Sequence, residues 1–138
     1  MVKLNKFFVY GTLKVGGALA AQFDKYRENC VKAVLPNYAI YDLGWFPGIL
    51  KETGEEVFGE IHTYEEDEFK HVLNMFDRIE GYSAHSPGNS LYLRKVVTVV
   101  NENNNKVSCN CYIFNNAHKR SMSEFTKVAG KTWDIAKR

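Results

Sequence analysis

The chain has 138 residues, of which 45% are hydrophobic and 25% charged, and its formal net charge at pH 7 is only +2. This length fits one domain, residues 1–138, whose core needs neither disulfides nor a structural metal. Because Lys and Arg are dispersed, and neither a membrane-length apolar run nor a secretory start is present, we expect no nucleic-acid partner, no membrane partner and a cytoplasmic location.

The first predicted element is a strand over Phe7–Tyr10, in which every residue is aromatic or β-branched. Such a continuous run is typical of a strand covered on both faces. Gly11 follows at once and permits close approach by another group, while Thr12, Gly16 and Gly17 keep the turn small. Exposed backbone N–H groups in this turn would suit a carboxylate or a developing oxyanion. An ordinary first strand with a tight turn is the alternative.

Hydrophobic spacing and turn residues predict the next elements. They are a short helix over Ala18–Tyr26, a strand over Cys30–Tyr41 around a Pro36–Asn37 turn, an aromatic loop over Asp42–Leu50, a polar turn over Lys51–Glu55, and a strand over Val57–Tyr64. The aromatic loop contains Trp45, Phe46 and Pro47 and forms either a hydrophobic lid or part of a pocket floor. The glycine inside the last strand, Gly59, indicates close approach by a neighbour.

The clearest helix covers Glu65–Phe76, where apolar residues recur at helical spacing behind an acidic first turn. We expect it to stop near residues 77–81, with Gly81 as a left-handed cap. A loop over Tyr82–Ser90 follows. Strands over Leu91–Val100 and Lys106–Phe114 then flank a polar turn over Asn101–Asn105 and form a hairpin, and the partly helical remainder is Asn115–Arg138. The sum is an α+β domain whose mostly antiparallel strands can close into a barrel.

No convincing metal site is visible in the sequence. Cys109 and Cys111 stand at alternate strand positions, so a buried core face explains them better than metal binding together with His118. The odd number of three cysteines favours reduced thiols. No ligand spacing links the other histidines, which are His62, His71 and His85. We therefore expect no metal and no other cofactor.

Glu80 is the candidate catalytic residue, because it stands between an apolar helix face and a glycine-bounded loop. Partial burial there would raise its pKa and make it a useful base near neutrality, whereas a solvated surface charge is the alternative. Tyr92 and Arg94 lie two residues apart on one strand and share a face. They either line the cavity or form a structural hydrogen bond with a carboxylate such as Asp77.

Five motifs in order resemble the γ-glutamylcyclotransferase-like family, which includes the γ-glutamylamine cyclotransferases and the AIG2-like proteins. The motifs are Phe8–Leu13, Tyr41–Gly44 with Phe46–Gly48, Val57–Glu60, Phe76–Gly81 and Tyr92–Arg94. The resemblance implies a small mixed β-barrel flanked by a few helices. It also implies that Tyr10, Gly11, Thr12 and Leu13 bind the glutamyl group and that Glu80 is the general base.

On this basis we expect a cofactor-independent enzyme that converts a γ-glutamyl amine or γ-glutamyl amino acid to 5-oxoproline and a free amine. The α-amine of the substrate attacks its own γ-carbonyl while Glu80 moves the proton. The substrate is a free γ-glutamyl amino acid, a glutathione-like peptide or γ-glutamyl-ε-lysine. A non-catalytic binding module that keeps the pocket is the alternative. We favour a monomer.

Overall fold

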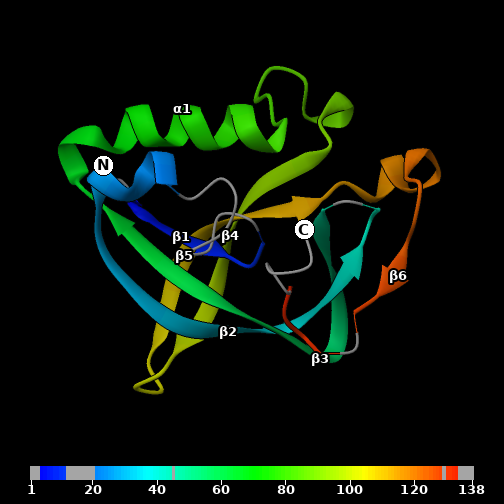
Figure 1. Cartoon of the computed structure of the whole chain (residues 1–138), viewed down its shortest axis with the longest axis horizontal. Coiled ribbons are helices and arrows are strands. Elements are labelled where there is room, and N and C mark those ends of the chain that lie inside the picture. Colours follow the sequence, from blue (N-terminus) through cyan, green and yellow to red (C-terminus); the bar gives the residue numbers. More distant parts are fainter. Residues whose placement is uncertain (1–3, 12–20, 45, 129, 134–138) are drawn as a thin grey trace.

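The computed structural model describes residues 4–11, 21–44, 46–128 and 130–133. Five strands form a closed barrel in the order β3-β1-β5-β4-β2, which closes because β2 also pairs with β3 (Figure 1). The strands are β1 (Lys6–Val9), β2 (Arg27–Asp42), β3 (Pro47–Tyr64), β4 (Tyr92–Asn101) and β5 (Lys106–Phe114), and a short β6 (Thr126–Lys127) pairs with β2. Among the barrel pairs, β1 and β5 run parallel and the others antiparallel. The predicted mixed, mostly antiparallel α+β barrel is confirmed.

The opening strand is buried on both faces, as its composition predicts. Phe8 points into the barrel and packs with residues such as Ile61 and Cys111, whereas Phe7 points outward and stacks on Phe76 of the helix at a centroid distance of 4.3 Å. Two apolar clusters result, one inside the barrel and one between the barrel and helix α1 (Phe69–Glu80). In Figure 1 this helix lies across one side of the barrel. β1 therefore contributes side chains to both clusters, as β3, β4 and β5 also do.

β2 and β3 are longer than the sequence indicates. The expected turn at Pro36–Asn37 is wrong, because β2 continues through it with a shift of register, and Asn37 takes a positive φ of 64°. The expected loop over Asp42–Leu50 is also too long, since β3 already begins at Pro47. The expected polar turn over Lys51–Glu55 lies within β3. There the register passes from Tyr38↔Lys51 to Pro36↔Glu56, so the polar residues between them bulge from the ladder.

The main helix begins later than predicted and ends where expected. A short 3-10 turn, η2 (Glu66–Glu68), precedes α1, and α1 ends at Glu80, within the residues 77–81 where we expected it to stop. The predicted left-handed cap is confirmed, since Gly81 has φ 68° and ψ 37°. The predicted helix over Ala18–Tyr26 is instead a 3-10 turn over Ala21–Tyr26 (η1), and its first three residues lie outside the described part of the chain.

The β4–β5 hairpin is confirmed to within a residue at each end. Cys109 and Cys111 are fully buried inside the barrel, as predicted. A 3-10 turn, η3 (Pro87–Asn89), interrupts the predicted loop before β4, and another, η4 (Asn116–Ser121), follows β5. The structure thus confirms the hairpin and refines the segments on either side of it.

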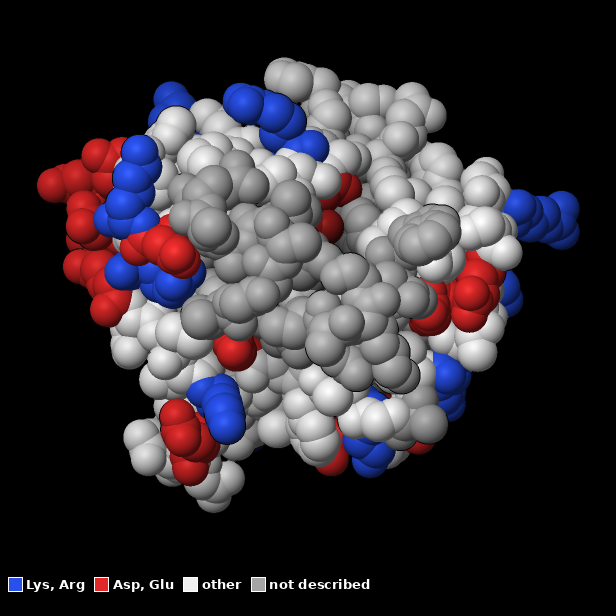
Figure 2. All heavy atoms as spheres, in the orientation of Figure 1, with Lys and Arg blue, Asp and Glu red and all other residues white. Residues whose placement is uncertain are grey.

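Charged residues are mixed on the surface. On the face shown in Figure 2, Lys and Arg side chains are scattered, and acidic side chains gather at the end of the molecule where η2 precedes α1. Within the described residues, each helix is too short or too polar to cross a lipid bilayer.

Candidate active site

A cavity of about 340 Å³ lies between the end of β1, the start of β3 and the end of α1. Its walls are mostly aromatic and aliphatic, and its described lining is Phe8, Val9, Tyr10, Gly11, Phe46, Pro47, Ile79, Glu80, Gly81, Leu91, Tyr92 and Tyr112. The carboxylate of Glu80 is the single acidic group of this lining, which contains no lysine, arginine or histidine. The size suits a small metabolite rather than a polymer.

The end of α1 sets the position of Glu80. Tyr82 N–H donates to the Asp77 carbonyl at 2.9 Å, and Gly81 N–H donates to the Arg78 carbonyl at 3.3 Å, which is the Schellman pattern. Gly81 reverses the chain at a positive φ that disfavours other residues, so Glu80 is the last helical residue and faces the cavity. Gly81, the last residue of the Phe76–Gly81 motif, therefore ends the helix directly after the candidate base.

Burial raises the pKa of Glu80 to about 7. The surrounding apolar walls replace the water that would otherwise solvate the charged form. In the described part of the chain, no cation pairs with this carboxylate and no hydrogen bond to it is formed. A carboxylate with a pKa near neutrality can both accept and return a proton at physiological pH.

Asp77 ties α1 to the barrel one helical turn before Glu80. Its carboxylate accepts a hydrogen bond from the Tyr112 hydroxyl on β5 and lies 3.4 Å from Nη1 of Arg94 on β4. The guanidinium of Arg94 also lies over the ring of Tyr82, 5.3 Å from its centroid. Because Asp77 and Glu80 are three residues apart on one helix, these contacts hold the end of the helix against the cavity.

Three tyrosines of the cavity wall use their hydroxyls within the protein. Tyr10 donates to the carbonyl of Tyr112 at 2.7 Å, Tyr92 donates to the carbonyl of Pro47, and Tyr112 donates to Asp77. Burial raises the pKa of each, with smaller contributions from the negative charge of Glu80, so all three stay protonated. Their hydroxyl groups therefore connect the strands and the helix that form the cavity wall.

Gly11 lies against Pro47 across the mouth of the cavity. An ideal Cβ on Gly11 would be 2.7 Å from Cγ of Pro47, which is too close without movement. Only glycine fits this approach, as the sequence indicates for the turn after β1. The loop containing Phe46 and Pro47 contributes to the cavity wall, and Trp45 lies outside the described residues.

The structure brings most of the predicted site together. Tyr10, Gly11, Glu80 and Tyr92 all line the cavity. Thr12 and Leu13, predicted to bind substrate, lie outside the described residues. Arg94 is not among the described lining residues and pairs with Asp77, which is the structural alternative that its position in the sequence left open.

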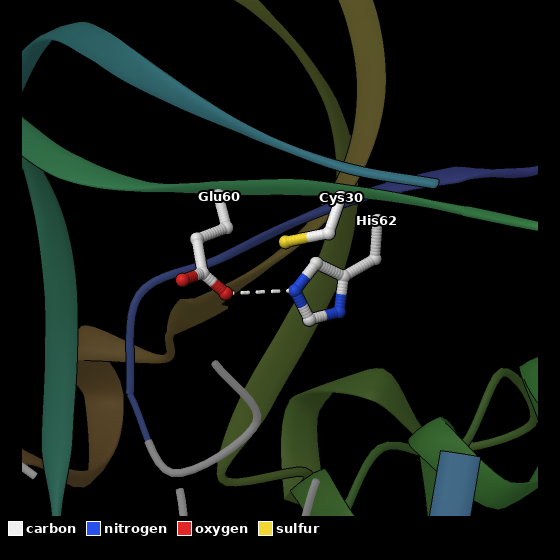
Figure 3. A group of neighbouring side chains, drawn as sticks. All are labelled: Cys30, Glu60 and His62. Atoms are coloured by element: carbon white, nitrogen blue, oxygen red, sulfur yellow. Dashed lines mark hydrogen bonds and ion pairs between the residues drawn. The ribbon is translucent and has the colours of Figure 1, made fainter. Parts of the chain in front are cut away.

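Sequence reasoning missed Tyr112, Ile79 and Leu91 as parts of the wall. For Tyr112 a signal existed, because the alternation that buries Cys109 and Cys111 places Tyr112 on the opposite face of β5, toward α1. It also missed a separate group of potential metal ligands, Cys30, Glu60 and His62, whose ligand atoms all lie within 4.8 Å of one another (Figure 3).

Comparison with known proteins points to one family. The family model described as "Gamma-glutamyl cyclotransferase, AIG2-like" matches residues 7–135. No protein of curated function matches the chain.

Several solved structures share the fold. One Arabidopsis thaliana protein is 30% identical over 99% of this chain and 73% of its own, with a TM-score of 0.64, and another is 26% identical over 89% and 76%, with a TM-score of 0.65. An AIG2-like protein from Mus musculus is 19% identical over 96% of this chain and 90% of its own, with a TM-score of 0.67, a likeness that concerns the fold alone.

Proposed function

Since the chain belongs to the γ-glutamyl cyclotransferase, AIG2-like family, we propose that it converts a γ-glutamyl amine or γ-glutamyl amino acid to 5-oxoproline and the free amine. The observation that carries this proposal is the Glu80 carboxylate, which lies in a mostly apolar cavity and whose pKa burial raises to about 7. A family likeness alone would fit a pocket that only binds its ligand. A carboxylate so costly to charge fits proton transfer better.

The reaction needs a substrate folded on itself and a group that transfers the protons of its α-ammonium group to the leaving amine. The substrate enters with a charged α-ammonium group, and Glu80 removes a proton from it. The free amine then attacks the γ-carbonyl carbon of the same molecule, which forms the ring C–N bond and places negative charge on the carbonyl oxygen. As the C–N bond to the leaving nitrogen breaks, the protonated Glu80 gives its proton to that nitrogen. The ionised Glu80 then takes the second proton from the ring nitrogen and passes it to the released amine, so the products are 5-oxoproline and an ammonium ion. Atoms and charge then balance without a cofactor.

The cavity wall supplies the geometry for this intramolecular attack. Gly11 brings backbone rather than a side chain to the cavity, so backbone N–H groups of this turn are the proposed partners of the glutamyl carboxylate or the developing oxyanion. The aromatic walls exclude water, which strengthens those contacts. A positioned base contributes roughly 10²–10⁴-fold, so the folded conformation of the bound substrate supplies much of the remaining acceleration.

The test is a panel of γ-glutamyl compounds incubated with the protein, with 5-oxoproline detected by mass spectrometry. The panel contains γ-glutamyl amino acids, glutathione and γ-glutamyl-ε-lysine. We expect turnover of at least one member, reduced at least 10²-fold in Glu80→Gln and unchanged in Glu102→Gln, an exposed glutamate in the β4–β5 turn. Binding of a panel member by calorimetry without any 5-oxoproline would support the binding module instead.

The pH dependence gives a second readout. Because Glu80 must be ionised to act, kcat/KM of the wild type should rise as the pH increases through about 7. This limb should be absent from the residual activity of Glu80→Gln. A limb that persists in the variant would assign the base to another group.

A further inference from the structure

Three potential metal ligands meet on one face of the β2–β3 ladder, outside the lining of the cavity. Cys30 and His62 are direct partners across the two antiparallel strands, and Glu60 stands two residues before His62 on the same face of β3. Figure 3 shows their side chains pointing toward one another, and their ligand atoms all lie within 4.8 Å of one another. The group combines a thiol, a carboxyl and an imidazole, which are the three side-chain types that bind zinc.

The three side chains differ in their exposure to solvent. His62 is fully buried and its Nε2 lies 2.8 Å from Oε1 of Glu60, so the imidazole is held in place. The Glu60 side chain is 20% exposed, and Cys30 is exposed to solvent. The cluster thus has a rigid inner ligand and an open outer side, through which an ion can enter and a water molecule can complete its coordination.

Tyr64 orients the imidazole from behind. Its hydroxyl lies 3.2 Å from Nδ1 of His62, on the same strand. When Nδ1–H donates to this hydroxyl, Nε2 carries the lone pair and faces Glu60 and the thiol. A histidine that binds a metal through one ring nitrogen commonly has its other nitrogen hydrogen-bonded in this way.

We propose that Cys30, Glu60 and His62 bind one divalent cation of borderline softness, for which Zn²⁺ is the best match. Tetrahedral zinc with bonds of about 2.0–2.3 Å places its ligand atoms roughly 3.3–3.8 Å apart. The group reaches this arrangement when the Glu60–His62 pair opens by about half an ångström and the thiol moves inward, both by side-chain rotation. Metal binding requires deprotonated ligand atoms, so the Cys30 thiol releases its proton to solvent, and Nε2 of His62 and the Glu60 carboxylate bind through their lone pairs.

The position of the proposed site in the barrel indicates how a bound metal ion would affect the stability of the protein. β2 follows η1 directly, and Cys30 is near its start. Glu60 is the register partner of Val9, which lines the cavity. A bound ion would therefore join the first part of β2 to β3 beside β1, the strand that leads into the Gly11 turn. We expect it to stabilise the barrel, because a ligand that binds only the folded state raises its stability.

The test uses purified full-length protein treated with a chelator and then dialysed. Zn²⁺ is titrated in competition with a chromophoric indicator, and Co²⁺ is added separately, because a thiolate-to-Co²⁺ charge-transfer band reports sulfur coordination. We expect one zinc per chain, the charge-transfer band, and a Tm that rises with zinc concentration.

The variants Cys30→Ser and Glu60→Gln each should weaken zinc binding at least tenfold and reduce the zinc-dependent rise in Tm. Cys30→Ser should also abolish the charge-transfer band. The exposed His71→Gln is the matched control and should behave as the wild type. Less than one zinc per chain, or full binding in Cys30→Ser, overturns the proposal. Since none of these readouts involves turnover, they are independent of the role proposed for Glu80.

Discussion

The raised pKa of Glu80 predicts that the wild-type protein loses stability as its candidate base ionises. The unfolded chain binds this proton with the usual pKa of 4.5, and the folded protein binds it with a pKa of about 7. The favourable effect of the protonated carboxyl is complete below about pH 4.5 and is lost as the pH rises through about 7. The shift of about 2.5 units, at 1.36 kcal/mol per unit, corresponds to about 3 kcal/mol.

Glu80→Gln removes this cost, since glutamine stays neutral and is nearly isosteric. Above about pH 8 the variant should be more stable than the wild type by about 3 kcal/mol, or roughly 10 °C in Tm for a domain of this size. At about pH 4 the two proteins should be equally stable. The assay is equilibrium unfolding in urea at a series of pH values for both proteins. The free energy of unfolding of the wild type minus that of the variant is then plotted against pH.

Glu102→Gln serves as the control, because Glu102 is exposed and lies outside the described lining of the cavity. Its free energy of unfolding should differ little from that of the wild type. A flat difference for Glu80→Gln as well would refute the reasoning. It would mean that the carboxylate is solvated or neutralised, and the case for a base tuned by burial would fall with it.

Three further substitutions test the cavity wall. Gly11→Val places a side chain against Pro47, where even a Cβ would be 2.7 Å from Cγ of the proline. In a variant whose circular dichroism matches the wild type, affinity for a γ-glutamyl ligand should fall at least tenfold, and wild-type affinity would contradict the assignment. Asp77→Asn weakens the ion pair with Arg94 and loosens the end of α1. The kcat should fall about tenfold while KM stays nearly constant, and an unchanged kcat would limit Asp77 to a stabilising role. Tyr92→Phe leaves the buried Pro47 carbonyl without its donor and should cost about 1–3 kcal/mol in urea unfolding, whereas no loss would mean that water replaces the hydroxyl.

Local patterns in the sequence were sufficient for several elements. The aromatic run before Gly11 predicts a strand buried on both faces, and alternation over Lys106–Phe114 predicts a strand with Cys109 and Cys111 in the core. Gly81 was correctly identified as a left-handed cap. These predictions were correct because the alternation of buried side chains along a strand and the conformation of a helix cap both depend on residues that are close in the chain.

Where the sequence prediction was wrong, pairing between distant segments overrode local preference. Pro36–Asn37 and the polar residues 51–55 are typical of turns, yet both lie inside long strands because β2 and β3 pair along most of their length. The ladder accommodates the turn-forming residues as a bulge and a positive φ at Asn37. Turn propensity is a weak preference beside a whole strand of hydrogen bonds and buried side chains.

The site divides in the same way. The sequence by itself determined that Glu80 follows an apolar helix and precedes Gly81, and its motifs determined the family. Only the tertiary structure decided that Glu80 faces a mostly apolar cavity, that Asp77 pairs with Arg94, and that Tyr112 completes the wall. It also brought Cys30 next to His62, although they are 32 residues apart in the chain. Such contacts depend on strand register and helix docking, which the packing of the whole barrel sets rather than any local run of residues.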